Sequence, residues 1–444
     1  MSRMVRVLLT VIAMGAAYLP WVEERAAADE PKPGDVLNES TWQKAEGLLP
    51  PEILKHYQNG EYANPIVDWP ADQFEWPPDF RAGSEKNSGQ LDMNDAGTIV
   101  AKGSGTQPPF LIGFPFPIID KADPKAGAKI VWNYFYRTWY FGNLYAESQL
   151  NWVAPNKLER RADVDVSFEY YDGVPDGERL PNPENYSVRF LTITVSPADL
   201  NGTAALSWRF RDPTKRDASW AFVPALRRVR AISPSNRSDG FLGSDMSQDD
   251  GPFFDGKPED FTWTLKGEVD QLRFVDPLAL KGESQREWLP AGGWRGFWPD
   301  LKFIGYMDPA WKGSAWAPVT GALAKRRFYV VDGVPKDKYY LYGHLELYID
   351  AVTFQGAWNR KFSWQGELMN TLQIMAFPVA KSTRPDGKVD YNQSSNMAFQ
   401  CAESIKRNQA TVAGIKSDPK GGFDGRVTFP PDRFDVSSLS RYGK

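Results

Sequence analysis

The chain has 444 residues, of which 42% are hydrophobic and 24% charged, so it can bury a sizeable core and is not a disordered protein. Its 14% aromatic content, together with 37 glycines and 35 prolines, is typical of a turn-rich β protein. The formal net charge of -4 argues against nucleic acid as the main partner, and a single cysteine, Cys401, excludes an internal disulfide and a cysteine-based metal cluster.

The first residues have the pattern of a secretory signal. Two arginines precede an uncharged, mostly apolar run from Val7 to Leu19, and Ala26-Ala27-Ala28 offers a cleavage site. The apolar run is shorter than the roughly 20 residues that span a bilayer, which disfavours a membrane anchor. We therefore predict that residues 1–28 are a cleaved signal peptide and that the mature chain is exported and soluble.

Residues 29–137 are predicted to form a region of helices and loops. Pro51 to Tyr57 indicates a short helix, because Pro51 suits a first helical turn and Gly60 follows the end. Residues 64–117 are rich in proline and glycine and are predicted to be extended or loop-like. Residues 126–136 are predicted to be a helix that begins after Asp123-Pro124, although a buried strand would show the same apolar content.

Residues 138–416 read as a long series of strands. Apolar and polar residues alternate along them, as in half-buried strands, and glycine- and proline-bearing turns separate them. The close spacing after residue 326 favours one antiparallel sheet whose neighbouring strands are joined in sequence. Residues 417–444 are assigned to a C-terminal tail. The strands expected are 164–170, 188–195, 206–210, 261–265, 328–331, 344–349, 361–364, 368–377, 397–404 and 409–415.

One segment, residues 288–318, is unusually rich in tryptophan and has no clean periodicity. It could be a loop folded onto the sheet as part of the core. It could also be a lid or a surface that touches membrane or ligand, because tryptophan suits a boundary between lipid and water. Its tryptophans are Trp288, Trp294, Trp298, Trp311 and Trp316.

Signals for catalysis are weak. Only His56 and His344 are available, and no metal-protease, nucleophile-elbow or phosphate-loop motif is present. The acidic residues between 239 and 260 could bind calcium or pair for glycoside hydrolysis, but we favour a solvated loop whose carboxylates cap turns. We predict no enzyme, no cofactor and no metal; the alternative is a glycan-binding module or a glycoside hydrolase.

The stretch from Ser219 to Asp250 is the most distinctive in the chain. It reads as two short strands joined at Pro224-Ala225-Leu226, followed by the block GSDMSQDD. Alternation places Arg228 and Arg230 on one face of the second strand and Val229 on the other. Two interpretations remain open: a solvated outer face, or a contact with a partner or an anionic headgroup. The residues concerned are Arg227, Arg228 and Arg230.

The PALRRVR and GSDMSQDD blocks are similar to those of a known family. Together with Gly113-Phe114-Pro115-Phe116-Pro117 and residues 326–350, they resemble a large periplasmic proteobacterial family of unknown function. That family is described as outer-membrane lipoprotein-sorting-like and falls in the LolA/LolB-like superfamily. The residues that carry the second block include Gly243, Ser244, Asp245 and Asp250; Met246 stands where an aromatic residue is common.

The resemblance implies a mainly β fold, a curved open antiparallel sheet or incomplete β-barrel with helix and loop cover around an apolar cavity. It implies a periplasmic carrier of lipid or another hydrophobic molecule toward the outer membrane. An RND-type exporter or an outer-membrane component would be the partner, and a structural partner of such an export complex is the further alternative. Candidate ligand contacts are Trp220, Phe222, Phe261, Trp263, Trp294, Trp298, Trp311 and Trp316.

Overall fold

The computed structural model describes most of the chain after the predicted signal peptide, which itself lies outside the described residues. Residues Pro31–Lys444 form one compact unit. No helix among the described residues combines the length and the apolar character needed to cross a membrane. The described residues are 30–69, 76–277, 286–290, 292–298, 305–318, 321–377, 382–383, 387, 389–390, 396–414, 416 and 419–443.

The first part of this unit consists of short elements and one longer helix. Helix α3 has eleven buried residues, among them Ile130 and Phe135. Gly127 allows the helix to approach β11 closely, because a Cβ there would lie 2.8 Å from the backbone of Leu265. The elements are β1 (Val36–Leu37), η1 (Trp42–Ala45), α1 (Pro51–Gln58), β2 (Asn64–Val67), α2 (Pro78–Asn87), β3 (Leu91–Met93), β4 (Ile99–Ala101) and α3 (Ala126–Trp139).

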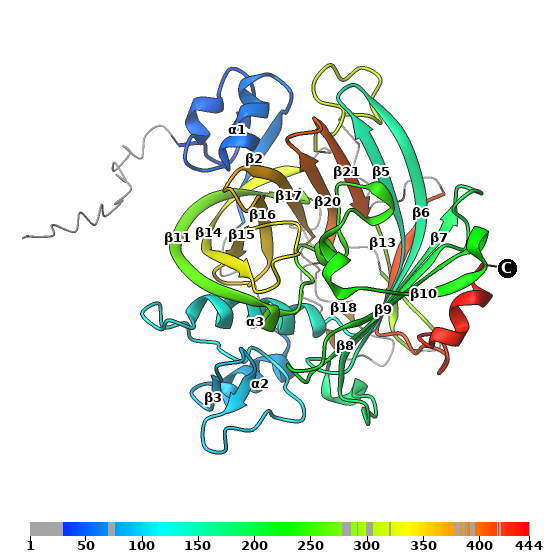
Figure 1. Cartoon of the computed structure of the whole chain (residues 1–444). Coiled ribbons are helices and arrows are strands. Elements are labelled where there is room, and N and C mark those ends of the chain that lie inside the picture. The colour runs from blue at the N-terminus through cyan, green and yellow to red at the C-terminus, as the bar shows by residue number, and fades with distance from the viewer. Residues whose placement is uncertain are drawn as a thin grey trace, which may run out of the picture. The chain divides into compact units, whose positions relative to one another are not determined.

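The main element is one large, strongly curved sheet, which does not close into a barrel (Figure 1). Its strands before the tryptophan-rich segment are β5 (Leu144–Ala154), β6 (Lys157–Tyr170), β7 (Tyr186–Ser196), β8 (Ala204–Phe210), β9 (Ala218–Val223), β10 (Arg228–Ile232) and β11 (Phe261–Val275). Those after it begins are β12 (Arg286–Trp288), β13 (Trp294–Phe297), β14 (Ala322–Pro335), β15 (His344–Asp350), β16 (Gly356–Phe362), β17 (Leu368–Phe377), β20 (Asn396–Ser404), β21 (Gln409–Gly414) and β22 (Gly422–Gly425).

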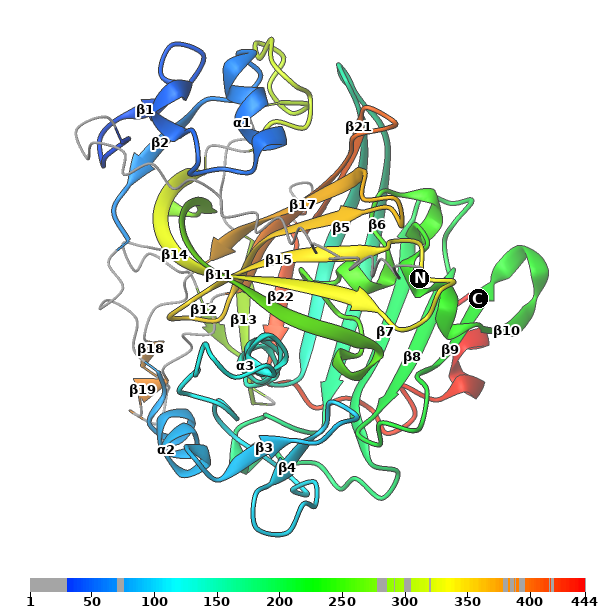
Figure 2. The same cartoon turned by 60° about the vertical axis from the view of Figure 1, so that its left-hand side comes forward.

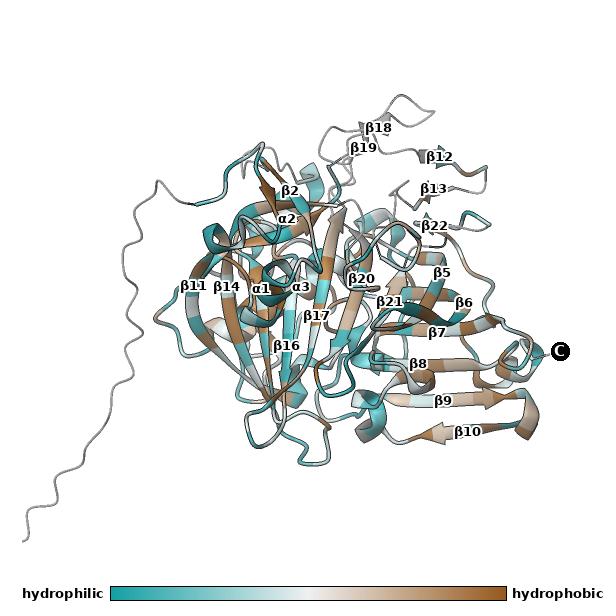
Figure 3. Ribbon diagram, turned by 90° about the horizontal axis from the view of Figure 1, so that it is seen from above, coloured by the Kyte–Doolittle hydropathy of each residue, from teal (hydrophilic) through white to brown (hydrophobic). Residues whose placement is uncertain are grey.

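The strand order is simple. An antiparallel run leads from β10 through β9, β8, β7, β6 and β5 to β21, and then through β20, β17, β16, β15 and β14 to β11. At the β11 end the sheet curls until Val275 meets Ala376 of β17 in a parallel pairing. At the other end, β10 is an edge strand that pairs with β9 (Figure 3). A separate hairpin is formed by β18 (Ser382–Thr383) and β19 (Val389–Asp390).

The predicted mainly β, curved and open architecture is confirmed. We predicted a purely antiparallel sheet, but two pairings, β11 with β17 and β2 with β14, are parallel. The predicted tail also contributes to the sheet, because β22 pairs with β5 and β13. The helix expected at residues 126–136 forms and extends to Trp139.

One expectation for the first part was wrong. Residues 64–117 were predicted to be extended, but helix α2 begins at Pro78 (Figure 2). Proline fits the first turn of a helix, where its missing N–H is not needed, so Pro77-Pro78 starts a helix here instead of preventing one. The short helix predicted at Pro51 to Tyr57 forms, and its His56 is 7% exposed and lies against β20. The strand predicted at 361–364 ends at Phe362 and begins earlier, at Gly356.

Four apolar clusters hold the described part of the unit together, the smallest of them around Trp69 and Val275. The largest joins α3 to the inner side of β6, β14 and β15. A second joins α1 to β11 and β16 and includes the buried Trp294, Trp298 and Trp316. A third covers the outer face of β7, β8 and β9 with the C-terminal segment around Phe434 and Leu439. The described tryptophans of residues 288–318 therefore pack mostly as core, which favours the first of the two interpretations of that segment.

Candidate functional site: an apolar cavity in the curved sheet

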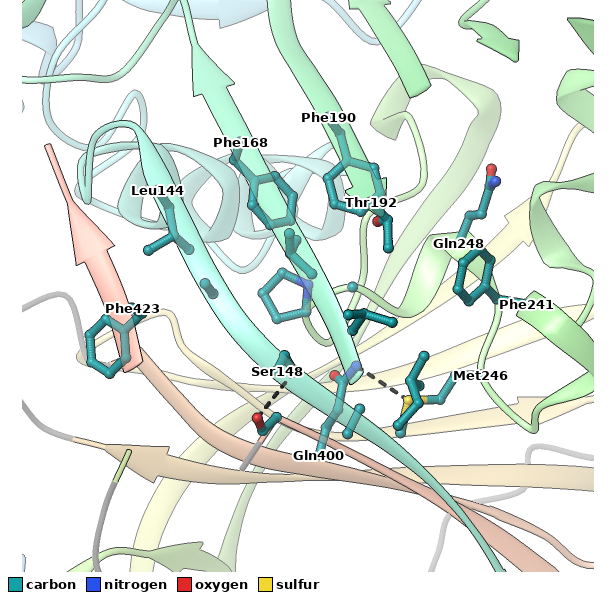
Figure 4. A pocket seen from close by; sticks show the side chains of 18 of the residues that line it. Leu144, Ser148, Phe168, Phe190, Thr192, Phe241, Met246, Gln248, Gln400 and Phe423 are labelled. Atoms are coloured by element: carbon teal, nitrogen blue, oxygen red, sulfur yellow. Dashed lines mark hydrogen bonds between the residues drawn. The ribbon is translucent and has the colours of Figure 1, made fainter. Parts of the chain in front are cut away.

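A cavity of about 180 Å³ lies against the inner face of β5, β6, β7 and β8. Because successive side chains of a strand point to opposite faces, alternate residues of β5, β6 and β7 reach the cavity, and Ala205 reaches it from β8. Phe168 and Phe190, which pair across β6 and β7, stand side by side in its wall (Figure 4). The strand residues that line it are Leu144, Ala146, Ser148, Leu150, Val164, Val166, Phe168, Tyr170, Phe190, Thr192 and Ala205.

The remaining walls come from distant parts of the sequence. The end of α3 and the loop that follows β10 contribute, as do β20, β21, β22 and the tryptophan-rich segment. The residues are Arg137, Thr138, Phe141, Phe241, Met246, Ser247, Gln248, Gly251, Pro252, Trp298, Gln400, Ala413, Gly414 and Phe423. The lining is thus dominated by aliphatic and aromatic side chains, as in small-molecule sites that take apolar ligands.

Several polar groups at the cavity wall already form hydrogen bonds within the protein. The Ser148 hydroxyl donates to the carbonyl of Gly414 over 3.0 Å. The Gln400 side chain accepts from the Phe253 N–H at 3.1 Å and contacts the sulfur of Met246 at 3.5 Å (Figure 4). A group that is already bonded to protein presents little polar surface to a guest. The Gln248 side-chain oxygen differs from these groups, because it is buried without a hydrogen-bond partner among the described residues.

Arg137 brings a cation to the cavity wall. It lies in the last turn of α3 and is 4% exposed. Burial lowers the pKa of its guanidinium to about 10, although Tyr134 and Asp350 act in the opposite direction. The side chain nevertheless stays protonated near neutral pH, so the apolar cavity has one positive charge at its boundary.

The GSDMSQDD block forms the wall that faces the sheet. Asp245 accepts hydrogen bonds from Arg407 and from Gln409 and Thr411, and its own N–H donates to the Thr411 hydroxyl at 2.8 Å. Asp250 caps the short helix η7 (Gln248–Asp250) through Ser247. These contacts fix the loop on which Met246 and Gln248 reach the cavity.

Three acidic residues of this block are buried, contrary to the expected solvated loop, whereas Asp239 and Asp260 are exposed. Asp245, Asp249 and Asp250 are 4%, 3% and 1% exposed. They are buried because each meets cations or hydroxyls: the Asp250 carboxylate lies 2.5 Å from the Lys361 ammonium, and Asp249 accepts from Tyr340 at 2.9 Å. Among the described residues no group of three or more His, Cys, Asp or Glu side chains is placed to hold a metal ion.

A buried charge network continues from this loop. Arg237 donates to Asp249 over 2.7 Å, and Arg209 donates to Asp217 over 2.9 Å. Burial would raise the pKa of Asp217, but the two guanidiniums outweigh it and lower that pKa. The network ties the loop after β10 to β8 and thereby fixes the distance between the two walls of the cavity.

Among the predicted ligand contacts, Trp298 lines the cavity and the other seven do not. Trp220 and Phe222 lie on the outer face of the sheet, in the cluster with the C-terminal segment. Phe261 and Trp263 pack against Phe254 in the main core. The other tryptophans are part of, or pack against, the second cluster, namely Trp294, Trp311 and Trp316. Sequence reasoning missed the cavity-lining residues of β5 to β8, whose alternation was visible but whose facing direction was not.

The predicted basic residues lie on the edge hairpin formed by β9, η4 (Pro224–Leu226) and β10. Arg227, Arg228 and Arg230 are exposed. Arg227 has a left-handed backbone conformation at the turn. Val229 packs on the outer face with Phe222. Arg228 and Arg230 therefore belong to the inner face, where both are exposed to solvent.

The comparison with known families agrees with the motifs. Residues 38–275 match the family described as "Protein of unknown function (DUF1329)". The chain belongs to this family. The match covers more than half of the chain and includes both diagnostic blocks, so the expected family membership is confirmed. Among the curated proteins none matches this DUF1329 chain.

Solved structures give distant similarities. A putative outer membrane lipoprotein-sorting protein domain from Vibrio parahaemolyticus is 15% identical, with a TM-score of 0.45, over 72% of this chain and 100% of that one. A DUF1329 family protein from Desulfovibrio piger ATCC 29098 is 17% identical, with a TM-score of 0.45 and the same coverage. The LolA superfamily protein NE2245 from Nitrosomonas europaea is 12% identical, with a TM-score of 0.38, over 69% and 96%.

Proposed function

We propose that this protein is a non-enzymatic periplasmic carrier that binds lipid or another hydrophobic molecule in the cavity of its curved sheet. The observation that carries the proposal is the apolar lining: alternate residues of β5, β6 and β7, with Ala205 of β8, face a cavity of about 180 Å³. Apolar cavities of about 150 Å³ stay dry and take up apolar guests. Transfer of an acyl chain from water into such a site is favourable by about 0.8 kcal/mol per buried methylene.

The place and direction of transport rest on the sequence. The signal-like residues 1–28 support export to the periplasm. The resemblance stated above supports a role in moving hydrophobic cargo toward the outer membrane, with an RND-type exporter or an outer-membrane component as partner. Recovery of such a component with the tagged mature chain from solubilised membranes supports this role. Recovery of the chain without any envelope protein argues against it.

The binding proposal is tested with an environment-sensitive apolar dye, N-phenyl-1-naphthylamine, and variants of the cavity wall. Ala205→Trp places a large side chain in the cavity from β8. Leu144→Trp does the same from a half-buried position on β5 and serves if the first variant does not fold. Ala225→Trp, at the exposed turn of the edge hairpin, is the matched control.

We expect the wild type and Ala225→Trp to bind the dye with similar affinity. The two cavity variants should keep the circular dichroism of the fold and lose most of the binding. Equal binding by all four proteins would show that the dye does not enter the cavity and would overturn the proposal.

A further inference from the structure

The inner face of the sheet continues beyond the cavity to the free edge at β10. Direct partners in an antiparallel ladder place their side chains on the same face. Thr192 pairs with Ala205, Ala205 with Ala221, and Ala221 with Arg230. Thr192 and Ala205 line the cavity. The side chain of Arg230 therefore lies on the same face of the sheet as the cavity. Arg230 belongs to β10, two strands away from Ala205 on β8.

The neighbouring row shows the same continuity. Phe190, at the cavity, pairs with Ser207, Ser207 with Ser219, and Ser219 with Ile232 of β10. The hydroxyls of Ser207 and Ser219 lie 2.8 Å apart, which confirms that these side chains share a face. Along β10 this face thus presents Ile232, then Arg230, then Arg228. The surface changes from apolar to cationic over three alternate residues.

The two arginines are available to a ligand. Arg228 and Arg230 are exposed, and neither side chain has a hydrogen bond or ion pair with any residue that the structure describes. The opposite face of the hairpin is occupied, because Val229 and Phe222 pack with the C-terminal segment. With strands about 4.8 Å apart, the Cα of Arg230 lies about 10 Å from that of Ala205. One amphiphile can span that distance, with its acyl chain in the cavity and its head at the edge of the sheet.

We propose that the cargo is an anionic amphiphile, whose acyl chain occupies the cavity and whose phosphate or carboxylate head binds Arg228 and Arg230. This inference rests on the proposed function, because it names the class of molecule that the same site takes. Guanidinium groups suit it, since they donate paired hydrogen bonds to phosphate and carboxylate oxygens. In a protein of net charge -4, these two exposed cations favour an anionic head at this edge of the sheet.

The test compares two lysolipids with the same acyl chain below their micelle concentrations. Lysophosphatidylglycerol carries a net negative charge, and lysophosphatidylcholine is net neutral. Glycerol 1-phosphate reports on the headgroup alone. The rim variant is Arg228→Gln with Arg230→Gln. The control Lys157→Gln with Lys406→Gln removes the same charge at exposed positions of two other hairpins. Binding is measured by calorimetry at two salt concentrations.

We expect the wild type to bind lysophosphatidylglycerol more tightly than lysophosphatidylcholine. The rim variant should lose roughly fivefold or more in affinity for the anionic lysolipid only, since each exposed charge contact contributes modestly. The difference should shrink at high salt, where exposed charges are screened. The control should stay within about twofold of the wild type.

The possible failures are distinct. If both lysolipids bind equally and the rim variant changes neither affinity, the headgroup site is overturned while the carrier function stands. If neither lysolipid binds, the proposed function itself fails. If glycerol 1-phosphate binds as tightly as the lysolipid, the arginines form a site for free phosphate, and the lipid-headgroup inference is overturned.

Discussion

Ala205 and Arg230 lie on the same face of the sheet, joined through Ala221 of the strand between them. Ala205 is 6% exposed and lines an apolar cavity, and Arg230 is exposed at the free edge. A single sheet surface therefore carries both a site for an acyl chain and a site for its charged head. The binding proposal and the headgroup proposal both depend on the register in which these strands pair. A shift of the register by one residue would turn the side chains to the opposite face of the sheet.

The pair Arg326 and Asp350 should be a major source of stability. Arg326 donates to both oxygens of Asp350 at 2.8 and 3.1 Å, and the Asp350 side chain is fully buried. Asp350→Ala leaves a buried cation without its partner and should lower the free energy of unfolding by about 3–5 kcal/mol. The adjacent pair Arg327–Asp270 is exposed, so Asp270→Ala should cost less than about 1 kcal/mol. Urea denaturation of both variants measures the difference, and equal losses would contradict this account.

His56 should make the stability depend on pH. Its ring nitrogens contact Glu61 at 2.5 Å and Glu403 at 2.8 Å, joining α1 to β20. Burial opposes the charged ring, but the two carboxylates outweigh it and raise the pKa of His56. Because the folded-state pKa is the higher one, the stabilisation is fully present below the ordinary pKa of about 6.5 and is lost as pH rises through the folded value.

The check is the free energy of unfolding of wild type and His56→Gln between pH 5.5 and about 8.5, a range that brackets the ordinary histidine pKa. The wild type should lose stability over the upper part of this range, and the variant should show a flatter profile. Parallel profiles for the two proteins would refute the assignment of the pH dependence to His56.

Asp245 should control the loop wall of the cavity. Its carboxylate is the acceptor for Arg407, Gln409 and Thr411, so Asp245→Ala removes the side-chain contacts of that loop with β21 and leaves the backbone contact with Thr411. We expect weaker binding of the apolar dye and faster proteolytic cleavage after residue 240, with a stability loss of about 1–3 kcal/mol. Asp239→Ala, at an exposed position of the same segment, is the control. Unchanged proteolysis in Asp245→Ala would argue against this role.

Gly127 should be intolerant of any side chain. A Cβ there would lie 2.8 Å from backbone atoms of Thr264 and Leu265 in β11. Gly127→Ala must push α3 away from the sheet and should cost about 1–3 kcal/mol. Gly103→Ala is the matched control, because open space surrounds that position. Thermal unfolding of the two variants measures the contrast, and similar midpoints would mean that α3 tolerates the shift.

The strands could be predicted because the alternation of apolar and polar residues is visible within each short segment. Residues 368–377 and the hairpin around Pro224 form as the alternation indicated. Alternation does not say which face of a strand is inner, however, and that choice depends on partners distant in sequence. Trp220 and Phe222 were chosen for aromatic character, but they face the C-terminal segment, whereas Ala205 and Thr192 face the cavity. Likewise, Asp249 and Asp250 looked solvated until folding brought Arg237 and Lys361 to them.

The central claim is that the cavity holds an apolar molecule, and native mass spectrometry with lipid extraction tests it most directly. The chain from Asp29 onward, which follows the predicted signal peptide, is purified from envelope extracts beside its Ala205→Trp variant. The wild type should carry a bound mass that passes into organic solvent and is identified as a lipid, and the variant should carry far less. Wild type that stays free of any bound mass after incubation with envelope lipids would contradict the account.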